Sequence, residues 1–322
     1  MSIDYDVLAR ELLRHLRGRR SQLAFSRRLG FRTNVAYTWE SGRRWPTAAI
    51  FLHAASRSRI DVRVALSSFF AAPPRWLDHV EPTSRDAVAS FLEELRAKVP
   101  IVDVARRAGR SRFAVARWLS GEAEPRLPDF FRMVDACSLR LLDFVALFAD
   151  PETLSSTSVA WQRMRAQRRA VYDEPWLAAV LLALELESYR KLRRHRPGWL
   201  ARRLGITRAE EDRCLRVLEA GGLVRWERDR WAIEPVETID TRPDAEAERR
   251  LKAWWSRVGA ERVAHGARGL FSFNVFTVSE RDLARLEELH RSYFRNLRAL
   301  VASSSPGERV VAANVQLFPL DG

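Results

Sequence analysis

The chain has 322 residues, 47% of them apolar, and a formal net charge of +14 at pH 7. This length and apolar content predict a folded, soluble protein of two to four domains. The longest apolar run, residues 176–186, is too short to span a bilayer, and the N-terminus has early acids but no apolar signal segment. From these features we expect a cytoplasmic protein that neither spans a membrane nor is secreted.

Positive charge is concentrated near the N-terminus. Residues 1–75 carry 14 Lys or Arg against 5 Asp or Glu, whereas residues 76–150 carry 11 against 12. A second basic excess falls in residues 151–235. A strongly basic domain attracts polyanions by counterion release, so the first 75 residues are the favoured place for a nucleic-acid site.

A segment of about seventy residues occurs twice, and the copies are seventy-nine residues apart. The equivalent pairs are Gly30 and Gly109, Trp39 and Trp118, Ser41 and Ser120, Gly42 and Gly121, Pro46 and Pro125, Phe51 and Phe130, and Phe69 and Phe148. Matches over this length indicate a domain used twice. We therefore expect one helical domain in residues 1–75 and a second, diverged copy in residues 76–150.

The first copy predicts two short helices joined by a tight turn. Ser21 is a suitable N-cap for the first helix, and Gly30 ends it. The second helix is expected from about Thr33 to Glu40. The predicted buried residues are Leu23, Phe25, Leu29, Ala36 and Trp39, with Phe31 between the helices. This is the helix-turn-helix arrangement.

The same residues resemble the Cro/C1 class of phage-repressor DNA-binding domains. The likeness rests on Ser21-Gln22, Leu29-Gly30, and Trp39-Glu40-Ser41-Gly42 with a following Pro46. In that class the second short helix lies in the major groove of double-stranded DNA. The resemblance implies base-edge contacts from Thr33, Asn34, Tyr37 and Thr38, with Arg32 beside them. It also implies a contact from Gln22 to a phosphate or a base, and backbone contacts from Arg28, Arg43 and Arg44.

The second copy keeps the apolar scaffold and changes the surface. At equivalent positions Ser21 becomes Pro100, Gln22 becomes Ile101, Arg43 becomes Glu122 and Trp45 becomes Glu124. Acids beside phosphates oppose DNA binding. Ser111 is nevertheless a good helix cap, and Arg110, Arg112 and Arg117 lie on or next to the second short helix, where arginine can read guanine. The pattern favours a structural or weakly contacting role for this copy.

Residues 158–236 show the element order of a winged helix. After a long apolar helix from Pro175 to Tyr189 come a short helix ending at Gly205 and a second helix with a Thr207–Glu210 capping box. Alternating apolar residues around the turn at 227–230 predict a hairpin. Some winged helices bind DNA and others only dimerise. In the DNA-binding case, Thr207, Arg208 and Glu211 face the DNA from the helix, and Arg225, Arg228 and Arg230 from the hairpin.

Residues 245–322 predict a small α/β domain. The expected elements are a helix at 245–258, a buried strand at 270–278, a long helix from about 280 to 302 capped by Ser279, and a second strand within 308–320. Two strands joined by a crossover helix suggest parallel neighbours in a sheet. The long helix has an apolar stripe from Leu283 to Leu300. The stripe either forms a dimer interface or covers the helix's own sheet.

The winged-helix pattern followed by strand, helix and an NVQLFP segment is similar to the C-terminal region of a family of functionally uncharacterised bacterial proteins. Such proteins are typical of myxobacteria and Fibrobacter relatives and are often regarded as regulators. The likeness covers about residues 160–320. The resemblance implies an architecture but little chemistry. The sequence therefore does not identify the ligand or protein partner that the C-terminal half would bind.

Nothing in the sequence indicates an enzyme. The six histidines are scattered, and no H-E-x-x-H motif, Walker-type glycine loop or nucleophile elbow is present. Cys137 and Cys214 lie in helical patterns without metal-ligand spacing, which predicts reduced, buried thiols. No catalytic residue, metal site or cofactor is predicted.

Taken together, the patterns predict a mainly α, sequence-specific DNA-binding transcriptional regulator that is a homodimer with a palindromic operator. The alternative is a non-catalytic adaptor or antitoxin-like protein that uses its helix-turn-helix repeats as scaffolds.

Overall fold

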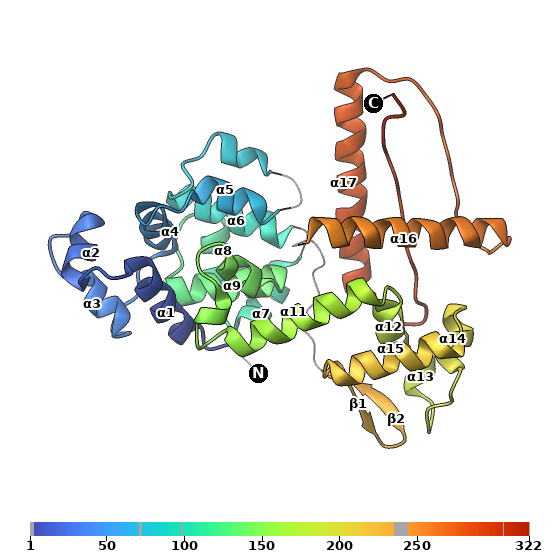
Figure 1. The fold of residues 1–322 in the computed structure, drawn as a ribbon. Helices are drawn as coiled ribbons and strands as arrows, with labels where there is room; N and C mark the ends of the chain where they lie inside the picture. The colour runs from blue at the N-terminus through green and yellow to red at the C-terminus, as the bar shows by residue number, and fades with distance from the viewer. Residues whose placement is uncertain (1–2, 71–72, 98, 235–243, 305, 322) are drawn as a thin grey trace. The chain divides into compact units, whose positions relative to one another are not determined.

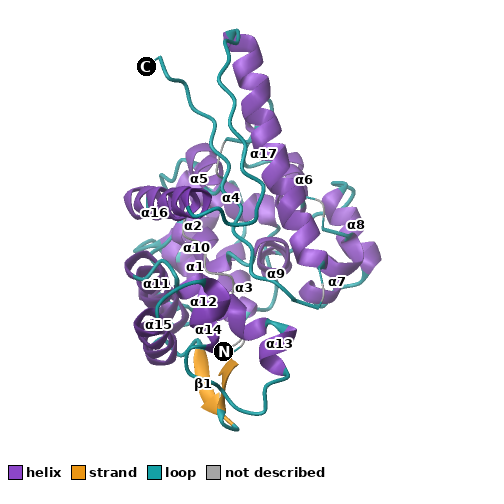
Figure 2. Ribbon diagram, turned by 90° about the vertical axis from the view of Figure 1, so that its right-hand side faces the viewer, coloured by secondary structure: helices purple, strands orange, loops and turns teal. Residues whose placement is uncertain are grey.

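The computed structural model describes residues 3–70, 73–97, 99–234, 244–304 and 306–321. In these residues the chain is mainly helical, as the sequence predicts, with one two-stranded antiparallel sheet (Figures 1 and 2). It divides into two compact units, residues 1–164 (unit 1) and residues 165–322 (unit 2). Within the described ranges, every helix is too short or too polar to cross a membrane.

The first repeat of unit 1 forms a bundle of short helices. They are α1 (Tyr5–Arg17), α2 (Gln22–Arg28), α3 (Val35–Glu40), α4 (Ala48–Arg57) and α5 (Val62–Ser68). Each helix begins after a residue whose side-chain oxygen accepts a backbone N–H, and these caps are Asp4, Ser21, Asn34, Thr47 and Asp61. The second helix of the helix-turn-helix therefore starts two residues later than predicted, because Asn34 is its N-cap.

The helix-turn-helix itself is compact. Gly30 has φ +87°, a left-handed conformation that glycine adopts without strain, and it turns the chain between α2 and α3. Phe31 packs edge-on against Trp39 at a ring-centroid distance of 5.6 Å. Phe25 and Leu29 are buried as predicted, but Leu23 is 38% exposed, so the buried face of α2 is narrower than the sequence suggested.

The second repeat of unit 1 follows the same order. Its elements are the 3₁₀ turn η1 (Arg75–Asp78), α6 (Arg85–Arg96), α7 (Ile101–Ala108), α8 (Arg112–Leu119), α9 (Leu127–Ser138) and α10 (Leu141–Ala146), followed by η2 (Pro151–Thr153). Ser111 caps α8 by accepting from the Ala114 N–H at 3.2 Å, as predicted. Pro100 precedes α7 and provides no side-chain cap.

The two repeats pack about a local two-fold axis. The Ala48 N–H donates to the Pro125 carbonyl at 3.1 Å, and the Leu127 N–H donates to the Pro46 carbonyl at 2.9 Å. These two bonds are equivalent at the seventy-nine-residue offset, so each repeat offers the other the same surface, as in an isologous dimer. Phe51 of the first repeat contacts Phe131 and Phe148 of the second. Residues 1–75 and 76–150 thus share one apolar core.

Unit 2 has its own core. Its elements are α11 (Ser158–Asp173), which crosses the boundary from unit 1, α12 (Leu177–Glu185), α13 (Glu187–Arg190), α14 (Trp199–Leu204), α15 (Arg208–Ala220), β1 (Val224–Glu227) and β2 (Arg230–Ile233). The predicted capping box of Thr207 and Glu210 is present at the start of α15. Arg228 and Asp229 both have positive φ, as a two-residue type I′ hairpin turn requires.

The last part of unit 2 differs from the prediction. It contains α16 (Ala245–Ala264) and α17 (Glu280–Ser303), and Ser279 caps α17 as expected. Neither 270–278 nor 308–320 is a strand within the described residues, so the small α/β domain does not form in the single chain. A strand needs a hydrogen-bonded neighbour. Residues 268–278 make no backbone hydrogen bond in the described part of the chain, and Phe273 is 94% exposed.

Candidate nucleic-acid interface

The surface of α2 and α3 is basic because its arginines are exposed and its one acid is buried. Between Glu11 and Asp61 the sequence contains a single carboxylate, Glu40. The Glu40 side chain is 5% exposed, at the end of α3. Four arginines of this stretch were predicted to contact DNA, and all four are exposed: Arg28, Arg32, Arg43 and Arg44. Within residues 12–60, the outer face of α2, α3 and the following loop therefore carries exposed arginines and no exposed acid.

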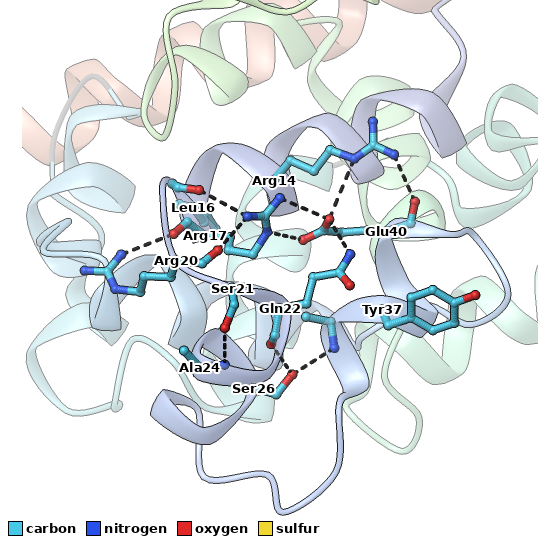
Figure 3. Close-up of polar contacts among 12 residues, drawn as sticks. Arg14, Leu16, Arg17, Arg20, Ser21, Gln22, Ala24, Ser26, Tyr37 and Glu40 are labelled. Carbon is cyan, nitrogen blue, oxygen red and sulfur yellow. Dashed lines mark hydrogen bonds and ion pairs between the residues drawn. The ribbon is translucent and has the colours of Figure 1, made fainter.

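Glu40 joins the three helices that hold this face. Its carboxylate accepts from Arg17 Nε of α1 at 2.6 Å and from Gln22 Nε2 of α2 at 2.9 Å (Figure 3). Arg14 of α1 donates to the Glu40 backbone carbonyl at 3.2 Å. The sequence placed Gln22 at a phosphate, but its side-chain amide is directed to Glu40 and the residue is half-buried. We call Arg14, Arg17, Gln22 and Glu40 the Glu40 clamp.

The residues predicted to read bases fall into two groups. Thr33 and Tyr37 are exposed, and Tyr37 extends away from the Glu40 clamp (Figure 3). Asn34 is exposed, but its Oδ1 accepts from the Tyr37 N–H at 3.3 Å, so the carbonyl end of this side chain caps α3. Thr38 is half-buried, and its hydroxyl donates to the Val35 carbonyl at 2.8 Å. Thr33, Tyr37 and the free amide of Asn34 remain available.

A hollow of about 690 Å³ opens beside α3. Thr33, Asn34, Thr38 and Arg44 contribute to its lining, together with the aromatic rings of Phe31, Trp39 and Trp45 and with Arg126 of the second repeat. Within unit 1, the polar residues at the start of α3 are thus not covered by the second repeat.

The predicted phosphate-binding arginines differ in how firmly they are held. Arg28 Nε donates to the Arg57 carbonyl at 2.8 Å, which fixes that side chain between α2 and the end of α4. The Arg43 guanidinium lies over the Tyr37 ring at 5.5 Å. Arg32 and Arg44 are exposed. Arg43 and Tyr37 therefore form a cationic and aromatic pair at the outer side of α3.

The corresponding arginines of the second repeat are partly neutralised. Arg110 pairs with Asp129 at 2.6 Å, and Arg117 lies 3.8 Å from Glu122 and over the ring of Phe113. Arg112 is exposed. Of the predicted secondary contacts, only the Arg112 position lacks a nearby acid among the described ion pairs.

Glu124 has a structural function that the sequence did not reveal. Its Oε1 accepts from the Ala49 N–H at 2.6 Å, in the first turn of α4. A carboxylate at a helix N-terminus is favourable for both hydrogen bonding and the helix dipole. The acid that replaces Trp45 in the second copy thus joins the two repeats, and it does not mark an acidic DNA-facing surface.

Unit 2 brings fewer predicted residues to a common surface. Thr207, Arg208 and Arg228 are exposed, and Arg208 lies 3.9 Å from Asp212. Arg225 pairs with Glu227 at 2.9 Å and with Glu234 at 2.8 Å. Glu211 was predicted to be exposed, but it is fully buried. Most of the predicted arginines of the hairpin and α15 thus have carboxylate partners, whereas the described ion pairs include none of Arg32, Arg43 and Arg44 of the first repeat.

The buried Glu211 takes the place of a helix cap. Gly198, the N-cap of α14, has no side chain, and Glu211 of α15 accepts instead from the Gly198 N–H at 3.1 Å and the Ala201 N–H at 2.7 Å. His195 Nε2 lies 3.6 Å from Glu211, and its Nδ1 is 3.1 Å from the Tyr189 hydroxyl. Burial lowers the pKa of His195, although Glu211 acts in the opposite direction. This cluster fixes α14 against α15.

Both cysteines lie in apolar surroundings that keep them protonated. Burial raises the pKa of both Cys137 and Cys214 to about 12, so both thiols stay protonated near neutral pH. Among the described residues, no group of three or more His, Cys, Asp or Glu is placed to hold a metal ion.

Residues 155–320 match the family described as Domain of unknown function (DUF4423). The match covers more than half of the chain, and the protein therefore belongs to this family. Comparison with curated proteins and with solved structures finds no match.

Proposed function

We propose that the protein is a sequence-specific transcriptional regulator that binds double-stranded DNA in the cytoplasm and acts as a homodimer. In this proposal α3 lies in the major groove, with Thr33, Tyr37 and the Asn34 amide towards base edges. Arg32, Arg43 and Arg44 contact phosphates from either side of α3. The Cro/C1-like helix-turn-helix is the part of the chain that reads DNA.

The observation that carries the proposal is the charge of the α2–α3 surface. The only carboxylate in residues 12–60 is buried and neutralised by Arg17, so it does not oppose a phosphate backbone. A scaffold domain has no need for an exposed face of arginines, whereas a DNA-binding domain gains most of its non-specific affinity from one.

In this proposal the second repeat mainly stabilises the first repeat and does not provide a second DNA-reading helix. Its Arg110 and Arg117 have acidic neighbours, while its Glu124 and the Ala48–Pro125 bond hold α4 of the first repeat. We assign to Arg110, Arg112, Arg117, Thr207, Arg208 and Arg228 at most secondary DNA contacts.

We expect Thr33→Ala to lower affinity for the specific operator by about 1–3 kcal/mol and to change affinity for random duplex much less. The reason is that Thr33 is exposed at the start of α3 and has no capping function, unlike Asn34. The operator is obtained by mapping bound genomic fragments, beginning with the protein's own promoter. Thr83→Ala, in the loop before α6 of the second repeat, is the control for the loss of a threonine side chain away from α3. Equal losses on operator and random DNA would contradict base reading by Thr33.

We expect Arg43→Ala to weaken binding to operator and random duplex alike. A lost phosphate contact reduces the slope of log K against log salt concentration by about one. Fluorescence anisotropy over a range of KCl concentrations measures this slope. Arg85→Ala, an exposed arginine in the first turn of α6, is the control. An unchanged slope for Arg43→Ala would show that this arginine does not contact phosphate.

A further inference from the structure

Most of the exposed large apolar side chains of the described residues lie in residues 270–320. They are Leu270, Phe271, Phe273, Val275, Phe276, Val278, Leu289, Tyr293, Leu300, Val301, Val311, Val315, Leu317, Phe318 and Leu320. Neither apolar core includes a fully buried residue from this region, and only Val310 packs at the edge of the unit 2 core. Exposed apolar side chains in this number mark an interaction site, because a monomeric protein rarely exposes so many in one region of the chain.

Most of the exposed residues belong to three segments, which are residues 268–278, α17 and residues 309–317. Residues 268–278 are extended and make no backbone hydrogen bond in the described part of the chain. α17 carries the stripe at spacings of three and four residues, and Leu289 and Leu300 on it are 65% and 72% exposed. Figure 2 shows α17 with extended segments before and after it.

The third segment, residues 309–317, has one face bound and one face free. Asn314 and Gln316 donate to the Ser256 hydroxyl of α16 at 3.1 and 2.6 Å. The odd-numbered Val311, Val315 and Leu317 are exposed. Asn314 and Gln316 alternate in the sequence with Val315 and Leu317, and alternate side chains of an extended segment point to opposite faces, so these apolar side chains lie on the face opposite the bonds to α16.

The area that the chain exposes is large enough to include a dimer interface. The chain exposes 19,920 Å². Two separate compact units, each of half the 37.1 kDa mass, would together expose roughly 16,500 Å². The chain therefore exposes about 3,400 Å² more than two such units, whatever their placement. An obligate dimer interface buries on the order of 1,000–2,500 Å² on each partner.

The chemistry of these segments fits a second copy of the same chain. An unpaired extended segment pairs with another unpaired extended segment, and an apolar helix stripe packs on another such stripe, so the surface is self-complementary about a two-fold axis. The charges of α17 favour the same partner. Arg285 pairs with Asp282 and Arg291 with Glu287 on the helix itself, so two α17 helices can approach without strong repulsion.

We infer that residues 268–320 form an intertwined homodimer interface, in which α17 packs against α17 of a second copy and the segments 270–278 and 309–317 pair as β-strands across the two chains. The inference deepens the homodimer part of the proposed function. It is tested without DNA, so its failure is distinguishable from a failure of DNA binding.

The first test is the mass of the full-length chain in solution, measured by light scattering at micromolar concentration without DNA. We expect twice 37.1 kDa for the wild type. Phe273→Arg and Leu289→Arg should each weaken association by at least about 100-fold, because each places a charge in an apolar dimer core. Val64→Arg, at an equally exposed valine of α5, should leave the dimer intact. A monomeric wild type, or a dimer unaffected by both variants, would overturn the inference.

The second test does not depend on the folding of any variant. Hydrogen exchange of the wild-type chain should show strong protection of the amides of residues 271–278 at concentrations where the dimer forms, and loss of that protection on dilution. The single chain offers these amides no hydrogen-bond partner among its described residues, so protection must come from the second copy. A dimer with unprotected amides at 271–278 would contradict the strand pairing.

Discussion

Glu40→Ala should lower the free energy of unfolding of unit 1 by about 3 kcal/mol. Removal of one partner from a buried ion pair leaves the other charge uncompensated, and the loss is largest when both side chains are fully buried. Glu40 is 5% exposed, but Arg17 is 23% exposed and can recover part of its hydration. This places the expected effect at the lower end of the usual range.

The measurement is chemical denaturation of the full chain, followed by hydrogen exchange of the backbone amides of α1, α2 and α3. Glu122→Ala is the matched control, because Glu122 is exposed and lies 3.8 Å from its arginine partner, so little change is expected. A Glu40→Ala chain as stable as the control would show that the Glu40 clamp does not hold α1, α2 and α3 together.

Glu211→Ala should lower the free energy of unfolding of unit 2 by about 3 kcal/mol. Two backbone N–H groups at the start of α14 lose their acceptor, and each buried donor left without a partner costs about 1–3 kcal/mol. The Ala201 N–H is buried, whereas the Gly198 N–H is only partly so. Since glycine cannot cap the helix, no other side chain of α14 replaces the carboxylate.

Thermal unfolding followed by far-UV circular dichroism measures this effect. Glu219→Ala is the control, because Glu219 lies on the same helix and is exposed. The prediction would be wrong if the two variants unfolded at the same temperature, since water would then satisfy the start of α14 equally well.

The local elements near the N-terminus could be predicted from sequence because they depend on neighbouring residues. Ser21, Ser111 and Thr207 cap the helices that they were expected to cap. Apolar periodicity also placed Ala36 and Trp39 in the core. Caps, glycine turns and apolar spacing are properties of a few consecutive residues, so they can be recognised directly in the sequence.

The functions of the buried acids could not be predicted, because they depend on contacts between distant segments. Glu40 binds Arg17, and Glu124 caps a helix seventy-five residues away. Glu211 has the spacing of an exposed helix residue but caps α14. One signal was present for Glu40, which is the only acid among the arginines of residues 12–60. A lone acid in such a stretch indicates a buried ion pair.

The C-terminal strands were predicted from their apolar residues, which indicate that a segment can pair in a sheet but not whether its partner lies in the same chain. Residues 270–278 have the composition of a buried strand but lie exposed in the single chain. The intertwined dimer accounts for both observations, because it supplies the missing neighbour from a second copy.

The most direct test of the DNA-binding proposal is the salt dependence of binding between the full wild-type chain and a random duplex. Each phosphate contact adds about 0.9 to the slope of log K against log salt concentration. With contacts from Arg32, Arg43 and Arg44, we predict clear binding at low salt and a slope steeper than about −2. Absence of binding at low salt would contradict the proposal and favour a scaffold function for the helix-turn-helix repeats.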